Sequence, residues 1–337
     1  MTDPTKIDAT TTSATGREPL AKIVVLMPDG DAMRDRLRAA FPAIDVAAAD
    51  PKDAAALADA DMAIGWSISP EALSGARRLR WFHLGAAGVE RMMRLPGFRE
   101  RNLILTNSSG ISAPNMAEHA MALMLAFARG LPSLQRAQEG RRWRDWDPGS
   151  ASFELGGQTV LIAGLGAIGQ ELARRASAFD MHVIGLRRSG TGEPIDDVDE
   201  VIGLDRLGAA LARTDHIVDL LPSTKGTAAL FDAGRFAAMK AGAYFYNLGR
   251  GTTVDQDALI DALKSGHLAG AGLDVTDPEP LNEESPLWGM GNVIITAHTS
   301  GGSPNVRERL IALCIEQVRR YQAGEDLLNV VDQTQGY

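Results

Sequence analysis

Short runs of apolar residues recur along the chain, separated by stretches that have helical spacing. Runs at 21–27, 159–166 and 292–298 predict β-strands. The run at 159–166 is continuously apolar into its glycines, which is typical of a strand buried on both faces of a parallel sheet. Further runs lie between them at 61–66, 79–85, 102–107, 216–222, 243–249 and 269–275. This alternation of strands and helices predicts an α/β fold.

One long helix is predicted over residues 114–138, because Pro114 suits an early helical position and an apolar sequence follows it. The alanine-rich residues 48–63 are interpreted as a surface helix and its flanks, and residues 141–158 as a loop. Since the long helix follows one series of strands and precedes another, it is expected to join two domains.

Composition agrees with a two-domain globular protein. The 337 residues suffice for about two domains. A net charge of -9 argues against non-specific binding to nucleic acid or to anionic membranes.

No run approaches the ~20 apolar residues of a membrane helix. Residues 1–19 are polar and are expected to form a flexible tail, not a secretory signal. The single Cys314 excludes an internal disulfide and fits a cytoplasmic location.

A glycine motif follows the second predicted strand. Gly164, Gly166 and Gly169 form G-x-G-x-x-G, which alone is a weak signal in a chain with 35 glycines. Here it directly precedes a segment with helical spacing. Gly164 would permit the tight turn, Gly166 the approach of a pyrophosphate, and Gly169 the close packing of the helix. The motif therefore predicts a dinucleotide site, with a bare βα turn as the alternative.

Two arginines follow the next apolar segment. Dinucleotide sites often carry a carboxylate about 20 residues beyond the glycines, where it binds a ribose hydroxyl. Arg187, Arg188 and Ser189 stand there instead and offer donors to a 2′-phosphate. The interpretation is a preference for NADP, with NAD as a possible cofactor. The alternative is a pair of solvated arginines.

Three chemically capable residues follow three other strands. His298 ends the run at 292–298, Arg250 follows the run at 243–249, and Glu279 lies after the run at 269–275. Because the carboxyl ends of parallel strands face the ligand crevice, these side chains are candidates for catalysis. A surface arginine and a solvated loop acid are the alternatives for Arg250 and Glu279. Among the other histidines, His83 has no obvious partner, and His119 and His182 are interpreted as packing or surface residues.

From about Arg80 to His298 the chain resembles the D-isomer-specific 2-hydroxyacid dehydrogenase family, in particular its glyoxylate/hydroxypyruvate reductases. The similarity rests on "GAAGVE", "NSSGISAPNMAEHAMALMLAFAR", "ELGGQTVLIAGLGAIG", "LLPSTKGT", "NLGRGTTVD", "GAGLDVTDPEPL", "SPLW" and "NVIITAHTSGG", in the family's order. The resemblance implies two Rossmann-like domains with parallel sheets and an active site in the interdomain cleft. The substrate domain would comprise 20–113 and 303–337, and the cofactor domain 114–302.

The resemblance also implies a reaction, the NAD(P)H-dependent reduction of a small 2-keto acid to the D-2-hydroxy acid. Arg250 would bind the substrate carboxylate and polarise the keto oxygen, and His298 would give that oxygen a proton. Glu279 would stabilise the charged imidazolium. The backbone at Ala87 and Gly88 would hold the carboxylate. Further cofactor contacts are implied at Leu165, Ala167, Ile168, Leu221, Pro222, Thr227, Asn247, Leu248, Gly249, Asp274, His298, Ser300 and Gly301, with Asp274 on the nicotinamide amide.

Three positions depart from the family pattern. Ala297 replaces the usual proline before the histidine, Glu90 replaces a common aspartate, and Arg187 replaces the acid of NAD-dependent members. A loop like that carrying Trp143 and Trp146 reaches the partner's substrate pocket in related homodimers. These tryptophans are therefore either pocket walls, or interface or core filler without substrate contact.

Two kinds of alternative function remain open. One is a reductase for a bulkier keto acid such as phenylpyruvate, and the other is a non-enzymatic, dinucleotide-sensing corepressor. Formate oxidation is disfavoured, since formate enzymes carry Gln where Glu279 stands. No metal site is expected, and the natural keto acid is not specified by the sequence.

Overall fold

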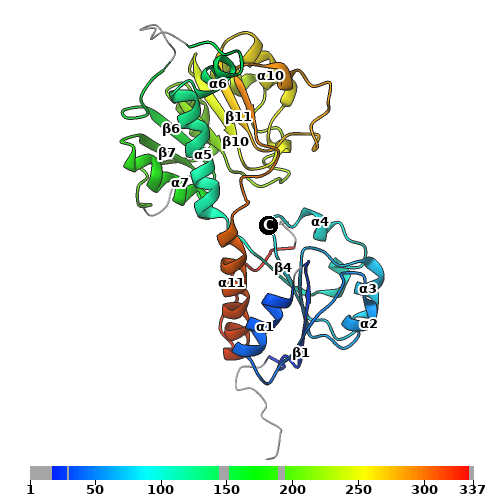
Figure 1. Cartoon of the computed structure of the whole chain (residues 1–337). Helices are drawn as coiled ribbons and strands as arrows, with labels where there is room; N and C mark the ends of the chain where they lie inside the picture. The colour runs from blue at the N-terminus through cyan, green and yellow to red at the C-terminus, as the bar shows by residue number, and fades with distance from the viewer. Residues whose placement is uncertain (1–16, 29, 144–151, 189–193, 334–337) are drawn as a thin grey trace, which may run out of the picture. The chain divides into compact units, whose positions relative to one another are not determined.

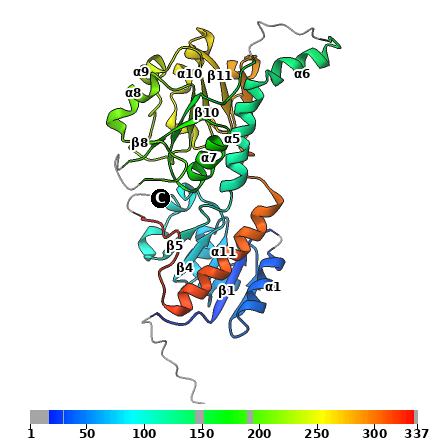
Figure 2. The same ribbon diagram turned by 90° about the vertical axis from the view of Figure 1, so that its left-hand side faces the viewer.

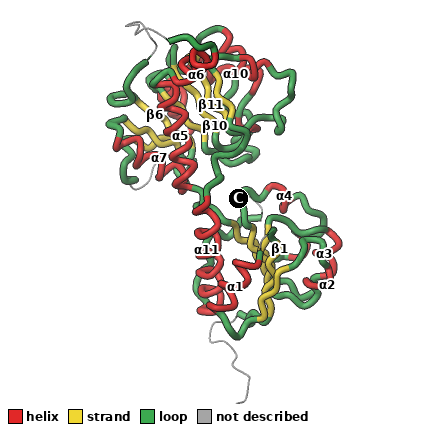
Figure 3. Tube along the Cα trace, in the orientation of Figure 1, coloured by secondary structure: helices red, strands yellow, loops and turns green. Residues whose placement is uncertain are grey.

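The apolar runs form the strands of two separate parallel sheets. The computed structural model describes residues 17–28, 30–143, 152–188 and 194–333. The chain divides into two compact units, Met1–Ile111 with Pro304–Tyr337, and Ser112–Ser303. In each unit one sheet is covered by helices (Figure 3). The predicted α/β class with two parallel sheets is confirmed.

The sheet of the first unit has five parallel strands in the order β2-β1-β3-β4-β5. This is the order of flavodoxin-like doubly wound sheets. The strands are β1 Lys22–Leu26, β2 Asp45–Ala48, β3 Met62–Gly65, β4 Trp81–Leu84 and β5 Ile104–Asn107. Apart from β2, they fall within the predicted runs.

Helices cover both faces of this sheet (Figure 1). Leu37 and Leu310 place α1 and α11 against one face, where Trp81 stacks on Tyr321 with ring centroids 5.2 Å apart. Leu57 and Leu73 place shorter helices on the other face. The helical elements are α1 Asp31–Ala40, α2 Ala54–Leu57, α3 Pro70–Gly75, α4 Glu90–Met93, η1 Arg99–Arg101 and α11 Pro304–Ala323.

The sheet of the second unit has seven parallel strands in the order β12-β11-β10-β9-β6-β7-β8. The order reverses at β6, which lies between β7 and β9, and dinucleotides bind at such a switch point in doubly wound sheets. The strands are β6 Thr159–Ala163, β7 His182–Leu186, β8 Glu200–Ile202, β9 His216–Asp219, β10 Ala243–Asn247, β11 Leu268–Leu273 and β12 Val293–Ile295.

The helices of this unit also lie on both faces of its sheet. Figure 2 shows α8 and α9 on the opposite side of the strands from α5 and α7. The elements are α5 Ala113–Ala128, α6 Leu131–Glu139, α7 Ala167–Ala178, η2 Leu204–Arg206, α8 Leu207–Leu211, α9 Ala233–Ala238, η3 Gly251–Thr253, α10 Gln256–Lys264 and η4 Pro286–Gly289.

Three predicted elements differ in the structure. The single helix over 114–138 is wrong, since α5 ends at Ala128 and α6 begins at Leu131. Gly130 has φ +63° between them, and Pro132 lacks the N–H that a continuous helix requires. The strands predicted at 159–166 and 292–298 each end three residues earlier than predicted, at Ala163 and Ile295. Within the described residues, every helix is too short or too polar to cross a membrane.

Candidate active site

The glycine loop connects β6 to α7 at the switch point of the second sheet. Gly164 has φ +108°, a conformation that side chains disfavour. A Cβ on Gly169 would lie 2.1 Å from the carbonyl oxygen of Gly164, so only glycine lets α7 approach the strand this closely. By contrast, a Cβ on Gly166 would meet no protein atom within 4 Å. The start of the helix at Gly166 is therefore an open cradle that fits a pyrophosphate.

The neighbouring strand ends border this loop. Asp219 of β9 pairs with Ala163 of β6, and the Leu220 N–H donates to the Ala163 carbonyl at 2.9 Å. A Cβ on Gly249 would lie 2.7 Å from the Leu221 carbonyl oxygen. The loops after β6, β9 and β10 are thus packed together. The predicted cofactor residues lie in these loops, at the end of β10 or at the start of α7: Leu165, Ala167, Ile168, Leu221, Pro222, Thr227, Asn247, Leu248 and Gly249.

The arginine pair follows β7, the strand next to β6. The Arg187 N–H donates to the Ile202 carbonyl at 3.0 Å, which fixes the backbone at the end of the strand. Arg187 is half-buried and Arg188 is exposed. Ser189, the third residue predicted to contact a 2′-phosphate, lies outside the described residues. The structure thus places both arginines at the carboxyl end of a strand adjoining the glycine loop.

The three candidate catalytic residues follow three adjacent strand ends. Asn247 of β10 pairs with Leu273 of β11, which pairs in turn with Ile295 of β12. Arg250 and His298 each come three residues after their strands, and Glu279 comes six residues after β11. The parallel register therefore brings all three loops to one edge of the sheet.

The side chains of His298 and Glu279 are in direct contact. The imidazole Nδ1 of His298 forms a hydrogen bond with Oε1 of Glu279. The side chains are 51% and 43% exposed, so the pair is open to solvent and to ligands. Because the carboxylate faces Nδ1, it leaves Nε2 as the ring nitrogen for proton exchange.

Asp274 holds the loop that carries His298. Ala297 and His298 both have positive φ, +47° and +57°, which is costly for residues other than glycine. The His298 N–H donates to the Asp274 carbonyl at 2.6 Å. The buried Asp274 carboxylate accepts the Thr296 hydroxyl at 2.6 Å and the Ser300 hydroxyl at 2.5 Å. These bonds fix the loop through Ser300 and Gly301, a structural task for Asp274 that the sequence did not suggest.

Arg250 begins a tight turn pressed against the loop that leads to Glu279. A Cβ on Gly251 would lie 1.9 Å from the Thr276 carbonyl oxygen, so glycine is required for this close approach. The Arg250 guanidinium donates from Nη1 to the Gly249 carbonyl at 2.8 Å. The Arg250 carbonyl accepts a hydrogen bond from Asn247 Nδ2 at 3.0 Å.

One acidic residue at this edge was missed by the sequence analysis. Asp219 ends β9 and is fully buried. Burial raises its pKa to about 7, against the opposing effect of hydrogen bonds from Thr253 and from the Leu221 N–H. The signal was present in "HIVDLLP", where an acid interrupts an apolar run.

In the first unit, the predicted substrate loop follows β4. Asn107 Nδ2 donates to the Ala87 carbonyl at 2.8 Å, and the Ser108 N–H donates to the Ala86 carbonyl at 3.1 Å. Gly88 follows in the same loop. The buried His83 contacts Thr106 Oγ1 at 2.8 Å and Ser108 Oγ at 3.1 Å. Burial lowers its pKa to about 4, so His83 is a neutral core residue below this loop.

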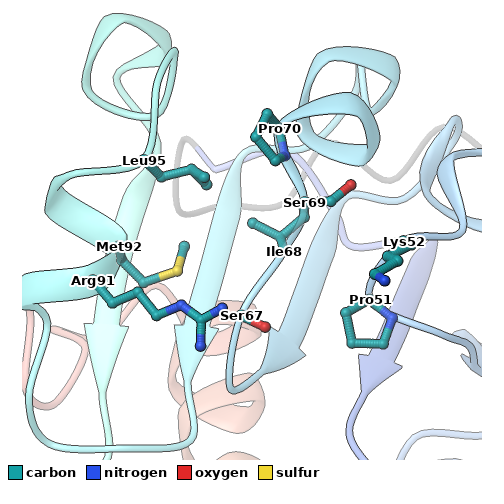
Figure 4. A pocket seen from close by; sticks show the side chains of 9 residues that line it. All are labelled: Pro51, Lys52, Ser67, Ile68, Ser69, Pro70, Arg91, Met92 and Leu95. Carbon is teal, nitrogen blue, oxygen red and sulfur yellow. The ribbon is translucent and has the colours of Figure 1, made fainter.

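A pocket of about 230 Å³ lies at the same edge of the first sheet. Its residues follow the ends of β2, β3 and β4 (Figure 4). Lys52 and Arg91 make its rim basic, and Ser67 and Ser69 add hydroxyl groups. The rest of the lining is apolar, from Pro51, Ile68, Pro70, Met92 and Leu95.

Comparisons with known proteins agree with this geometry. A family model for the NAD binding domain of D-isomer specific 2-hydroxyacid dehydrogenases matches residues 121–300. The NADPH-dependent glyoxylate/hydroxypyruvate reductase of Sinorhizobium meliloti, solved with NADP and sulfate, is similar at 32% identity and a TM-score of 0.80, over 94% of this chain and 100% of that one.

Two further relatives extend the comparison. A D-isomer specific 2-hydroxyacid dehydrogenase from Xanthobacter autotrophicus, solved with NADPH and MES, is 30% identical with a TM-score of 0.81, over 94% of this chain and 100% of that one. The glyoxylate reductase of Pyrococcus furiosus is 32% identical over 265 residues, 77% of this chain and 77% of its own length. As the motifs predicted, the chain belongs to the D-isomer specific 2-hydroxyacid dehydrogenase family.

Proposed function

We propose that this protein reduces a small 2-keto acid of the glyoxylate/hydroxypyruvate type to the D-2-hydroxy acid, with NADPH as the reductant. The observation that carries the proposal is the contact between His298 and Glu279 at the sheet edge that also bears Arg250 and the glycine loop. A bound nicotinamide supplies the hydride. The protein must then hold the carboxylate, polarise the keto group and deliver one proton.

Each task has a candidate residue in one of the two units. Arg250 presents a planar guanidinium that can bind a carboxylate through two hydrogen bonds and polarise the keto oxygen. His298, with Nδ1 on Glu279, donates a proton from Nε2 to that oxygen and takes it back in the reverse reaction. Ala87 and Gly88 are the proposed backbone donors to the carboxylate. Asp274 is assigned to the nicotinamide amide.

The preference for NADPH rests on Arg187 and Arg188. Their position at the end of β7 is where dinucleotide-binding sheets meet the adenosine ribose. Two guanidinium groups there offer charge-assisted hydrogen bonds to a 2′-phosphate. The relatives from Sinorhizobium meliloti and Xanthobacter autotrophicus were solved with NADP and NADPH, which supports the same choice.

The proposal includes a homodimer. Trp143 follows α6 and is 94% exposed, and Leu131 and Leu134 on α6 are also exposed. Large apolar side chains gathered on one exposed segment are typical of an interface. Trp146, the second candidate for a partner contact, lies outside the described residues. Sedimentation of wild type and of Trp143→Ala would measure whether this segment supports dimerisation.

The direct test is a keto-acid panel assayed by the loss of NADPH or NADH absorbance. Glyoxylate and hydroxypyruvate should be reduced with higher kcat/KM than phenylpyruvate, and NADPH should be preferred over NADH. A preference for phenylpyruvate would contradict the proposed class of small keto acids and favour a reductase for bulkier ones. Dinucleotide binding without turnover of any acid would instead support the corepressor-like alternative.

A further inference from the structure

We propose that Asp219 is an uncharged carboxylic acid in the working protein and positions Arg250 through the hydroxyl group of Thr253. Asp219 touches no substrate in this proposal and is a positioning residue. The inference rests on the proposed role of Arg250, but the protonation state of Asp219 can be measured without any catalysis.

The two short contacts of Thr253 require more protons than its hydroxyl group carries. Thr253 Oγ1 lies 2.5 Å from Asp219 Oδ2 and 2.6 Å from the Arg250 carbonyl oxygen. A threonine hydroxyl carries a single proton and can donate only one hydrogen bond. Both neighbouring oxygens are acceptors when Asp219 is ionised. One of the two short contacts would then join two oxygens with no proton between them.

Protonation of Asp219 resolves the conflict. Oδ2–H donates to Thr253 Oγ1, and the Thr253 hydroxyl donates to the Arg250 carbonyl. The other oxygen, Oδ1, still accepts the Leu221 N–H at 3.0 Å. Every polar atom in this series of hydrogen bonds, from the Asp219 carboxyl to the Arg250 carbonyl, then has a hydrogen-bond partner, as buried polar groups require.

The surroundings favour the uncharged form. Asp219 is fully buried, and burial raises its pKa to about 7. Burial is the largest influence on this pKa, and the hydrogen bonds from Thr253 and from the Leu221 N–H act in the opposite direction. The titratable side chains of the elements packed around it are Asp215 and His216 of β9, Tyr244 and Tyr246 of β10, Lys225 of the following loop, Arg250 of the turn, Asp232 and Arg235 at α9, and Asp255, Asp257, Asp261 and Lys264 at α10.

At least half of these groups have hydrogen-bond or ion-pair partners of their own. Asp215 pairs with Lys240 at 2.6 Å, and the Tyr246 hydroxyl contacts His216 at 3.0 Å, both toward the opposite end of the strand. Arg235 pairs with Asp232 at 3.4 Å. The Asp255 side chain accepts the Ala258 N–H at 3.1 Å.

Ionisation of Asp219 should loosen Arg250. The Thr253 proton would turn toward the carboxylate, and the Arg250 carbonyl would lose a hydrogen bond. Arg250 would be less well placed for the keto acid, so KM should rise in the pH range where Asp219 ionises. The pair of Asp219 and Thr253 therefore couples substrate binding to pH at a point separate from His298.

Infrared spectroscopy tests the protonation state directly. Wild type and Asp219→Asn would be prepared with aspartate labelled by heavy carbon in the side-chain carboxyl group. Below about pH 6, the difference spectrum should contain one protonated-acid carbonyl band, which fades above about pH 8. Asp215→Asn, at the other end of β9, should leave the band in place. Absence of the band from wild type at the lower pH would overturn the proposal.

Kinetics test the connection to Arg250. Thr253→Val removes the hydroxyl group that connects Asp219 to Arg250. It should raise the KM for the keto acid about five- to tenfold, with a smaller change in kcat. Thr253→Ser keeps the hydroxyl and should restore the wild-type KM. In Asp219→Asn the amide can donate to Thr253 at every pH, so the alkaline rise in KM should disappear. An unchanged rise in that variant would refute the coupling, whereas inactivity of wild type on every acid would refute only the proposed function.

Discussion

His298 and Glu279 meet through a hydrogen bond although they belong to loops that follow different strands, β12 and β11. The imidazole is oriented by the carboxylate, and the imidazolium form gains a neighbouring negative charge. The two residues therefore form an acid–base unit whose parts can be tested separately.

The first prediction concerns this unit. Glu279→Gln removes the carboxylate that orients the imidazole through Nδ1, so kcat for keto-acid reduction should fall. His298→Ala should lower kcat by about 10²–10⁴-fold, the usual loss for a general acid. The measurement is the pH profile of kcat/KM for both variants. A profile of Glu279→Gln that coincides with wild type would show that the contact has no role in proton transfer.

The second prediction separates cofactor binding from folding at the glycine loop. Ala at position 166 meets no protein atom within 4 Å, so Gly166→Ala should keep the wild-type melting temperature. It should nevertheless weaken dinucleotide binding more than about tenfold, because the methyl group occupies the space meant for the pyrophosphate. Gly169→Ala is the contrast, since its Cβ would collide with Gly164 at 2.1 Å and lower stability as well. Calorimetry and fluorescence titration measure the two effects.

The third prediction concerns cofactor choice. Arg187→Asp should lower kcat/KM for NADPH by about ten- to a hundredfold, the value of one or two charge-assisted hydrogen bonds. The NADH value in the same variant serves as the internal control and should stay level or rise. If the ratio of the two cofactors does not move, Arg187 does not contact the phosphate.

The fourth prediction concerns the close approach of the Arg250 turn to the Glu279 loop. In Gly251→Ala the new methyl group would lie 1.9 Å from a backbone oxygen of Thr276, so one of the two loops must shift. Activity should fall by at least about a hundredfold, as for small misplacements of catalytic groups. Gly208→Ala, in a helix and with no atom within 4 Å of its Cβ, is the matched control and should fold and react normally. Equal activity of the two variants would contradict the argument.

The fifth prediction concerns stability. The pKa of Asp219 is raised from 3.8 to about 7 in the folded protein, so the proton favours folding. This contribution is complete below about pH 4 and is lost as the pH rises to about 7, at roughly 1.4 kcal/mol per pH unit. Asp219→Asn has no such loss and should gain stability relative to wild type across that range. Denaturant unfolding at a series of pH values measures the difference, and parallel curves would show that Asp219 is ionised in the folded state.

Much of the fold could be predicted from the local pattern of apolar and polar residues, because buried parallel strands are continuous apolar runs. The strands β2 and β8 escaped prediction, since "DVAA" and "EVI" are too short and too polar to stand out. The break at Gly130 was missed because the apolar pattern continues on both sides of it. Strand order and the register that aligns Asn247, Leu273 and Ile295 depend on tertiary packing, which no local pattern encodes.

The candidate site, like the fold, could be predicted from the sequence only in part. Arg250, Glu279 and His298 could be found from glycine-rich strand ends and the family resemblance. The support of His298 by Asp274, and of Arg250 by Asp219 and Thr253, could not be found. Asp274 and Asp219 end other strands, and they meet their partners only in the folded sheet.

The return of the chain to the first unit through α11 has a consequence during protein synthesis. Leu310, Ile311, Cys314 and Val318 are part of the apolar core beneath β1, and the Val331 N–H bonds to Leu105. The ribosome releases residues 112–303 before any of these groups is available. The dinucleotide-binding unit can therefore fold while the first unit still exposes the part of its sheet that α11 later covers, and chaperone binding during translation should concentrate there.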